Sequence, residues 1–216
     1  ASMGILHSSD KDKAKLTELL KNFDSISVRE QDLYELIQPL TEKKVEIVLD
    51  PVFLLTKSDW QSIIGERKVK RKYILLYNLL HNDEAVQCAK QIAKKENLEI
   101  VEINGKIDST IYYRRKRYNS GGPIDFLSLL YHAEFVVSTS FHGVAFAILF
   151  NKQFFSFLKE HSERIVSILN RFELSDRFYP DKELIKTVKP IDYNKVNKLI
   201  DKSRKLSASF IEDNLK

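Results

Sequence analysis

A hydroxyl-rich stretch ahead of an apolar run contains the strongest candidates for catalysis or ligand binding. It reads Ser138-Thr-Ser-Phe-His-Gly143, and it follows the β-favouring run Phe135-Val-Val137 and leads into the apolar segment Gly143 to Phe150. This order predicts a strand, a tight turn and a buried helix. The turn would lie at the carboxyl end of the strand, beside the free N–H groups of the helix. Open α/β sheets bind ligands there, and anionic ligands in particular.

Four side chains are candidates for proton transfer or for anion binding. His142 is a candidate acid or base, because imidazole exchanges a proton near neutral pH, and Gly143 beside it permits close approach. Arg29 ends a predicted strand and offers a planar fork that suits carboxylate or phosphate. Arg164 and Arg177 would add positive charge to the same cleft. Each candidate also has an ordinary interpretation: a structural histidine, a surface arginine or a local ion pair.

Several familiar signatures are absent from the chain. There is no glycine-rich dinucleotide or P-loop fingerprint, no Cys or His pair at metal-ligand spacing, and no nucleophile elbow. The single cysteine, Cys88, falls in an apolar-periodic helical stretch and is expected to be a packing residue. We therefore expect neither a cofactor nor a metal ion.

Composition limits the classes of protein that the chain can represent. Its 216 residues are 43% hydrophobic and 30% charged, which predicts a globular protein with a large core. No apolar run approaches the roughly 20 residues that span a bilayer, and the first residues lack the pattern of a signal peptide. The expected location is the cytoplasm, without a membrane span.

Two basic runs account for much of the net charge of +5. Arg67 to Lys72 is expected to be a solvated linker. Arg114 to Arg117 lies in a long aperiodic stretch, residues 104–122, and is interpreted either as a solvated face or as a loop that folds over an anionic ligand. Because acidic residues are interspersed and aromatic residues do not alternate with the basic ones, we expect no nucleic acid partner.

Helical and strand periodicities alternate along the whole chain. The pattern predicts an α/β fold with a mostly parallel, doubly wound sheet and helices on both faces, forming a single domain over residues 1–216 with a possible subdivision near 66–72. The helices are expected at 10–23, from the junction at 29–30 to 40, 58–64 (with Trp60 packed inward), 83–96, from 123, 143–150, 161–172 and 192–211. The strands are expected at 25–28, 44–49, 73–77, 98–103, 135–137 and 153–158.

Several stretches, taken in order, resemble the polysaccharide pyruvyl transferase family. They are Ala1-Ser-Met-Gly4, Ser27-Val-Arg-Glu30, Leu49-Asp-Pro-Val-Phe-Leu-Leu55, Trp60, Gly122-Pro-Ile-Asp-Phe-Leu127, Val137-Ser-Thr-Ser-Phe-His-Gly143, Phe146, Asn151 and Arg164. The resemblance implies one Rossmann-like half of a GT-B-like fold. It also implies transfer of pyruvate from phosphoenolpyruvate to sugar hydroxyls of a bacterial surface polysaccharide or glycan precursor, which gives a pyruvate ketal.

The resemblance also implies roles for particular residues. His142 is expected to be catalytic, and the residues expected to bind the donor are Arg29, Ser138, Thr139, Ser140, Gly143 and Arg164. Two departures accompany it. Family members usually have a further half before the stretch matched by residues 1–4, so we expect a carboxyl-terminal part that pairs with a missing half or forms a homo-oligomer. Ser140 stands where some relatives carry an arginine.

Two other functions stay open at the level of sequence. The chain is also compatible with the nucleotide-sugar-binding half of an ordinary GT-B glycosyltransferase. It is compatible, from a different class, with a non-catalytic interaction module whose basic runs bind nucleic acid or an anionic membrane, although the interspersed acidic residues argue against it.

Overall fold

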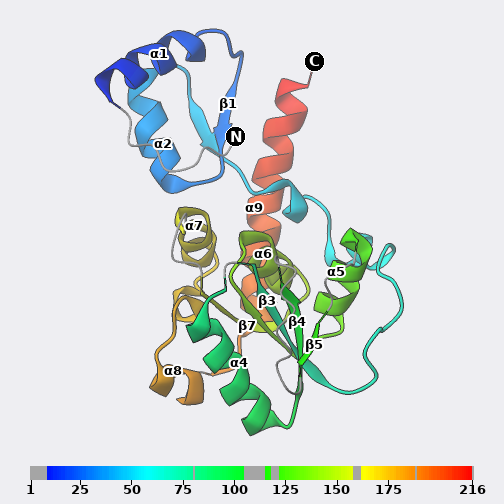
Figure 1. The fold of residues 1–216 in the computed structure, drawn as a ribbon. Coiled ribbons are helices and arrows are strands. Elements are labelled where there is room, and N and C mark those ends of the chain that lie inside the picture. The colour runs from blue at the N-terminus through cyan, green and yellow to red at the C-terminus, as the bar shows by residue number, and fades with distance from the viewer. Residues whose placement is uncertain are drawn as a thin grey trace. The chain divides into compact units, whose positions relative to one another are not determined.

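The computed structural model describes residues 9–79, 81–104, 115–117, 122–157, 162–187 and 189–215 (Figure 1). The chain divides into two compact units, which are described separately. Unit 1 comprises Ala1–Leu54, Glu160–Phe172 and Asn194–Lys216, and unit 2 comprises Leu55–Lys159 and Glu173–Tyr193. Residues 1–4 of the family-like pattern and Arg114 lie outside the described residues.

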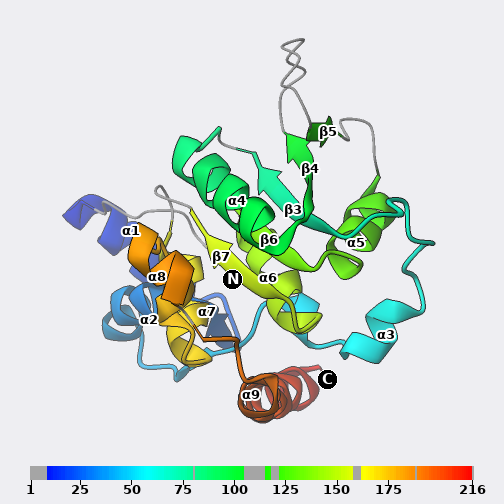
Figure 2. The ribbon, with the colours of Figure 1, turned by 90° about the horizontal axis from the view of Figure 1, so that it is seen from below.

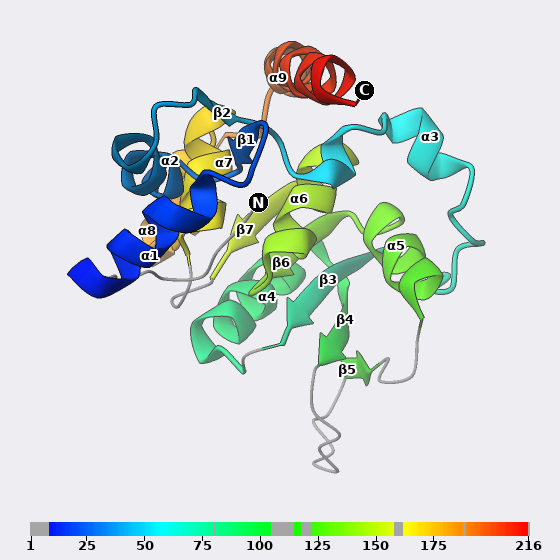
Figure 3. The same ribbon diagram turned by 90° about the horizontal axis from the view of Figure 1, so that it is seen from above.

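Unit 2 is built on a five-stranded parallel sheet in the order β5-β4-β3-β6-β7. The strands are β3 (Tyr73–Asn78), β4 (Glu99–Asn104), β5 (Arg115–Arg117), β6 (Phe135–Ser138) and β7 (Gln153–Ser156). Helix α4 (Asp83–Glu96) covers one face, and α5 (Pro123–Tyr131) and α6 (Phe141–Leu149) cover the other (Figures 2 and 3). This arrangement confirms the predicted doubly wound α/β class.

Alternation along the central strands explains why both faces are covered. Ile74 and Leu76 of β3 pack with Ala89 of α4, whereas the Tyr73 hydroxyl donates to the carbonyl oxygen of Leu129 in α5 at 2.6 Å. Five of the six residues of β3 are buried, namely residues 73–76 and Asn78, as expected for a strand between two helical layers. Cys88 is buried on α4, where burial raises its thiol pKa to about 12.

Unit 1 contains a two-stranded parallel sheet of β1 (Ile26–Val28) and β2 (Val45–Ile47). The helices α1 (Asp10–Leu20) and α2 (Gln31–Ile37) close a small core over it. The remaining helices of this unit are α7 (Glu163–Arg171) and most of α9 (Tyr193–Asn214). Ser207 of α9 is buried, and its hydroxyl accepts the Leu49 N–H at 2.8 Å, which ties the long helix to the end of β2.

The local signals explain most helix boundaries. Ser9 caps α1 with a capping box, and Pro39 turns the end of α2 into the 3₁₀ helix Gln38–Leu40, as predicted. The short helix expected at 58–64 is instead α3 (Lys57–Gln61), because Thr56 and not Ser58 accepts the capping bond from the Asp59 N–H. Further 3₁₀ turns lie at Pro51–Phe53 and Ser175–Arg177, and α8 spans Lys182–Thr187.

The basic and aperiodic segments have the following structure. Lys68 of the first basic run is exposed and pairs with Asp125, in agreement with the solvated interpretation. The second run does not lie wholly in a loop, because Arg115–Arg117 forms the edge strand β5 beside β4. The other residues between 105 and 121 lie outside the described part of the chain. No described helix is long and apolar enough to cross a membrane.

Candidate functional site

The turn between β6 and α6 forms as predicted, and its hydroxyl groups hold it together. The Ser138 hydroxyl accepts the Ser140 N–H at 3.0 Å and donates to the Ser140 carbonyl at 3.1 Å. The Thr139 hydroxyl accepts the Leu79 N–H at 3.0 Å, and the Thr139 N–H donates to the Tyr77 carbonyl at 2.9 Å. Because Ser138 and Thr139 are buried and engaged in these bonds, they fix the shape of the turn.

Gly143 lets the first turn of α6 lie directly against the sheet. A Cβ atom at this position would lie 2.2 Å from the Ser138 hydroxyl oxygen and 2.7 Å from Cδ1 of Tyr77. Every side chain larger than hydrogen is therefore excluded without rearrangement. The close approach expected at Gly143 is made, within this unit, by two side chains of the protein itself.

His142 lies in the first turn of α6 and is exposed, whereas its neighbours Phe141 and Gly143 are buried. The helix begins with the bond from the Val144 N–H to the Ser140 carbonyl at 3.1 Å. Within the described part of the chain, no acceptor takes the N–H groups of His142 and Gly143. An exposed imidazole thus stands beside backbone donors at the positive end of a helix, an arrangement that favours a bound anion.

Tyr77 is a neighbour of this turn that sequence reasoning assigned only to the core. It pairs in register with Ser138 across β3 and β6, and its ring contacts Phe126 with centroids 4.8 Å apart. Burial raises the pKa of its phenol above the ordinary value of 10.0, although a hydrogen bond with Ser140 opposes the rise. The phenol is therefore a neutral hydrogen-bonding group near the turn at physiological pH. No local signal distinguished it from the apolar strand around it.

In unit 1, Arg29 follows β1 as predicted, and its guanidinium pairs with a buried carboxylate. Nη1 of Arg29 bonds to Oδ2 of Asp50, while Oδ1 of Asp50 accepts the Val52 N–H at 3.1 Å. The side chain of Asp50 is 3% exposed and that of Arg29 is 22% exposed. Arg29 also lines a pocket of about 270 Å³ with a mostly apolar wall that includes Leu49 and Phe210. Asp50 therefore orients the guanidinium and offsets part of its charge.

Arg164 and Arg177 lie in different units. Arg164, in unit 1, has its Nε 4.0 Å from the Oε1 of Glu30, a buried residue that precedes α2. Arg177, in unit 2, is buried near the amino ends of the strands, whereas the turn at 138–143 follows the carboxyl end of β6. The expectation that Arg177 adds charge beside this turn is therefore wrong. Arg164 has the local ion pair that its ordinary interpretation predicted.

In the described ranges, no group of three or more His, Cys, Asp or Glu side chains is placed to hold a metal ion. The chemistry available at the turn is therefore that of an imidazole, a phenol, hydroxyl groups and backbone N–H donors. Arg29 and Arg164 belong to unit 1, and the turn belongs to unit 2.

Comparisons with known structures address the fold. The chain is similar to a protein assigned as a UDP-N-acetylglucosamine 2-epimerase from Listeria monocytogenes, with 12% identity and a TM-score of 0.52 over 84% of this chain and 53% of that one. It is also similar to UGT89C1 of Arabidopsis thaliana, solved with quercetin, with 8% identity and a TM-score of 0.50 over 96% of this chain and 61% of that one. The chain thus spans about half to three fifths of the length of these proteins, and its fold is of the same GT-B, Rossmann-like type.

Comparisons of sequence address the family. No curated protein matches the chain. A sequence model described as polysaccharide pyruvyl transferase matches residues 1–161, a range that includes β1, the Arg29–Asp50 pair, β6 and the whole turn before α6. The match covers most of the chain and agrees with the order of motifs in its sequence. This chain belongs to the polysaccharide pyruvyl transferase family.

Proposed function

We propose that this chain carries the donor site of a transferase that moves pyruvate from phosphoenolpyruvate to sugar hydroxyls of a surface polysaccharide or glycan precursor, forming a pyruvate ketal. The family is one of transferases, and the match includes the turn at 138–143. The observation that carries the proposal is the exposed imidazole of His142 beside the N–H groups that begin α6. A donor with a carboxylate and a phosphate needs such donors, together with a group that can transfer a proton.

The proposed reaction proceeds in three steps, for which these groups can provide the proton transfers. A proton adds to the methylene carbon of phosphoenolpyruvate, which leaves a cationic centre at the neighbouring carbon. A sugar hydroxyl adds there and loses its proton; the bond to the phosphate oxygen then breaks, and phosphate leaves with the electron pair. A second hydroxyl adds to the same carbon and gives its proton to base or to the departing phosphate. The products are the cyclic ketal and inorganic phosphate.

His142 is assigned the proton transfers of this course. As an acid it supplies the proton to the methylene carbon, and as a base it takes the proton from the attacking hydroxyl. The N–H groups of His142 and Gly143 are assigned to an oxyanion of the donor, with the Ser140 side chain at the start of the helix. Ser138 and Thr139 act in this proposal by holding the turn, because their hydroxyls are already bonded within the protein.

Arg29 and Arg164 are proposed as further contacts of the donor. The fork of Arg29 suits a carboxylate or phosphate, and its pairing with Asp50 uses one of its terminal nitrogens. Arg164 is 35% exposed, and its Nε faces Glu30 at the long distance of 4.0 Å. Arg29 therefore keeps donor groups beyond its ion pair. The two residues are tested one by one, because they belong to unit 1 and His142 belongs to unit 2.

The test is a calorimetric titration of the chain with phosphoenolpyruvate, beside the same titration with uridine diphosphate, in moderate salt. We expect phosphoenolpyruvate to bind, and we expect His142→Ala and Arg29→Ala each to weaken it at least tenfold, because a hydrogen bond to a charged group contributes about 1.5–3 kcal/mol. Arg29→Lys should weaken binding as well, since it keeps the charge and loses the fork. Circular dichroism shows whether each variant is folded.

Arg71→Ala is the matched control. It changes an exposed arginine just before the amino end of β3, away from the turn that precedes α6, and binding should stay within twofold. Binding that persists unchanged in both site variants would overturn the proposal. Binding of uridine diphosphate without phosphoenolpyruvate would favour a nucleotide-sugar site instead, and binding of neither would remove the donor site from these residues.

A further inference from the structure

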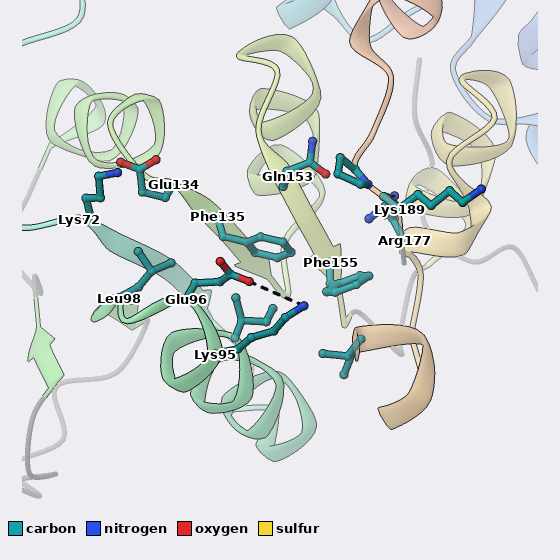
Figure 4. Close-up of a pocket in the computed structure, with 13 residues that line it drawn as sticks. Lys72, Lys95, Glu96, Leu98, Glu134, Phe135, Gln153, Phe155, Arg177 and Lys189 are labelled. Carbon is teal, nitrogen blue, oxygen red and sulfur yellow. Dashed lines mark hydrogen bonds and ion pairs between the residues drawn. The ribbon is translucent and has the colours of Figure 1, made fainter. Parts of the chain in front are cut away.

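Unit 2 has a pocket of about 470 Å³ at the edge of the sheet opposite the turn that precedes α6 (Figure 4). Its lining includes Lys72, Leu98 and Glu134, which stand immediately before β3, β4 and β6. The amino ends of these strands therefore form its base. Its volume falls in the range of small-molecule sites, about 300–1,000 Å³. The donor contacts proposed above use none of the residues that line it.

The charges around this pocket are mainly positive. Four of the described lining residues are basic and two are acidic: Lys72, Lys95, Arg177 and Lys189, against Glu96 and Glu134. Lys95 has a neighbouring carboxylate, with its Nζ 3.7 Å from Glu96. Within the described ranges, Lys72 and Lys189 form no ion pair. The lining thus has two positive charges more than negative ones, which favours an anionic occupant.

Arg177 is the buried cation of the pocket. Its side chain is 4% exposed, Nη2 donates to the carbonyl oxygen of Lys189, and the guanidinium carbon lies 5.7 Å from the centre of the Phe155 ring. Nε is buried and lies 3.3 Å from Oδ2 of Asp176, but the geometry between the two atoms is not that of a hydrogen bond. Placing a guanidinium here costs solvation free energy, and burial lowers its pKa. An oxyanion in the pocket would offset that cost.

The remaining wall of the pocket is apolar and partly open. Phe135, Leu98 and Ile185 are partly buried side chains that pack against the core between α4 and the sheet. The rings of Phe135 and Phe155 lie with their centroids 5.5 Å apart, and Lys95 extends beneath them in the view of Figure 4. An apolar ring of a ligand would cover the exposed edge of Phe135 and remove it from water. The pocket therefore offers an apolar wall beside a cluster of cations.

From this combination we propose that the pocket is a binding site for a small aromatic oxyanion, a flat ring carrying a phosphate or a carboxylate. The ring lies against Phe135 and Ile185, and the oxyanion lies toward Lys189 and Arg177. The site is separate from the proposed donor site, because the two lie at opposite ends of β6. A ligand bound here does not compete with phosphoenolpyruvate for the same groups.

The experiment titrates the chain with phenyl phosphate, benzoate and inorganic phosphate, and follows binding by calorimetry and by amide chemical shifts. Phenyl phosphate or benzoate should bind at least tenfold more tightly than inorganic phosphate, because only they carry the ring. The amide signals of Phe135 and Ile185 should move, and those of His142 and Gly143 should stay. The first two probes distinguish a phosphate from a carboxylate ligand, and binding of either one supports the proposal.

Variants at the exposed Lys189 and at the partly buried Ile185 test the location of the site. Lys189→Glu should weaken binding at least tenfold, and Ile185→Trp should abolish it by filling the pocket. Lys94→Glu changes the exposed lysine next to Lys95 on α4 that is not part of the lining, and binding should stay within twofold.

Three results would overturn the proposal: no binding of either aromatic probe, inorganic phosphate binding as tightly as both, or binding that survives Lys189→Glu and Ile185→Trp. Failure of the donor site would appear instead as loss of phosphoenolpyruvate binding. The two outcomes are therefore distinguishable.

Discussion

Gly143 and the side chain of Ser138 are packed so closely that a single added carbon at position 143 would lie 2.2 Å from the serine oxygen. The glycine and the serine lie on opposite sides of the turn that carries His142. The contact therefore couples the position of the helix start to the end of β6. The geometry of the candidate site therefore requires a glycine at position 143.

Gly143→Ala is expected to destabilise the protein. The new methyl group would displace the Ser138 side chain and the Tyr77 ring, and overpacking of this kind costs about 1–3 kcal/mol. Urea denaturation measures the change in the free energy of unfolding. Gly65→Ala is the control, because its Cβ would meet only an ordinary contact at 3.5 Å. Equal effects of the two substitutions would contradict the packing argument.

Thr139→Val should remove the hydroxyl that holds the turn to the end of β3 while preserving the shape of the side chain. The Leu79 N–H, which is partly buried, would lose its acceptor, and we expect a cost of about 1 kcal/mol, the low end of the range for an unsatisfied donor. Thr187→Val on α8 also deletes a hydroxyl bond, here to the Glu183 carbonyl, but at an exposed position. The control should change the free energy of unfolding by less than about 0.5 kcal/mol, and a similar loss in both variants would count against a role in the turn.

The pair of Arg29 and Asp50 should show a measurable coupling energy. A double-mutant cycle with Arg29→Met and Asp50→Asn is expected to give about 1–2 kcal/mol, since one partner is buried and the other is partly solvated. The exposed pair of Lys186 and Glu183 provides the comparison, with an expected coupling below about 0.5 kcal/mol. A coupling in the first cycle no larger than in the second would mean that Asp50 does not hold the arginine.

Lys152 should make stability depend on pH in the alkaline range. Burial, together with Lys57, lowers the pKa of this amine from the ordinary value of 10.5 to about 8. Between these two values the unfolded chain binds more protons, so the contribution of Lys152 to stability falls as pH decreases from 10.5 to 8 and is constant below. Lys152→Met should therefore raise the free energy of unfolding at pH 7 and remove this part of the slope. Urea titrations at several pH values measure the free energy of unfolding, and Lys90→Met is the exposed control. If Lys152→Met leaves the dependence of this free energy on pH unchanged, the argument is wrong.

The regular part of the fold could be predicted because its signals are local. Helix α4 has the predicted bounds, since Asn82 caps its start and the apolar stripe runs to its last turn. The prediction of a strand, a turn and a helix from β6 to α6 is also confirmed. It succeeded because hydroxyl residues separate a short apolar run from a long one. Thr56 shows the limit of such reasoning, because hydroxyl residues at 56 and at 58 can each cap a helix here, and the structure uses Thr56.

The candidate site was predicted less completely, because its supporting contacts link distant parts of the sequence. The partner of Arg29 lies 21 residues away, and the ring beside the turn, Tyr77, belongs to another strand. Strand β5 was missed because three basic residues carry no apolar alternation. The roles of Arg29, Ser138, Thr139, Ser140, His142, Gly143 and Arg164 in donor binding stay predictions, as does the subdivision near 66–72.

Because Cys88 is buried, its reaction with a thiol reagent can report local opening of the protein. Only one thiol is present in the sequence, and it lies inside the packing of α4 against the sheet, with its pKa raised to about 12. A thiol reagent at mild pH can therefore modify the protein only when α4 separates from the sheet. The labelling rate of the unmodified chain therefore measures opening of this packing in unit 2.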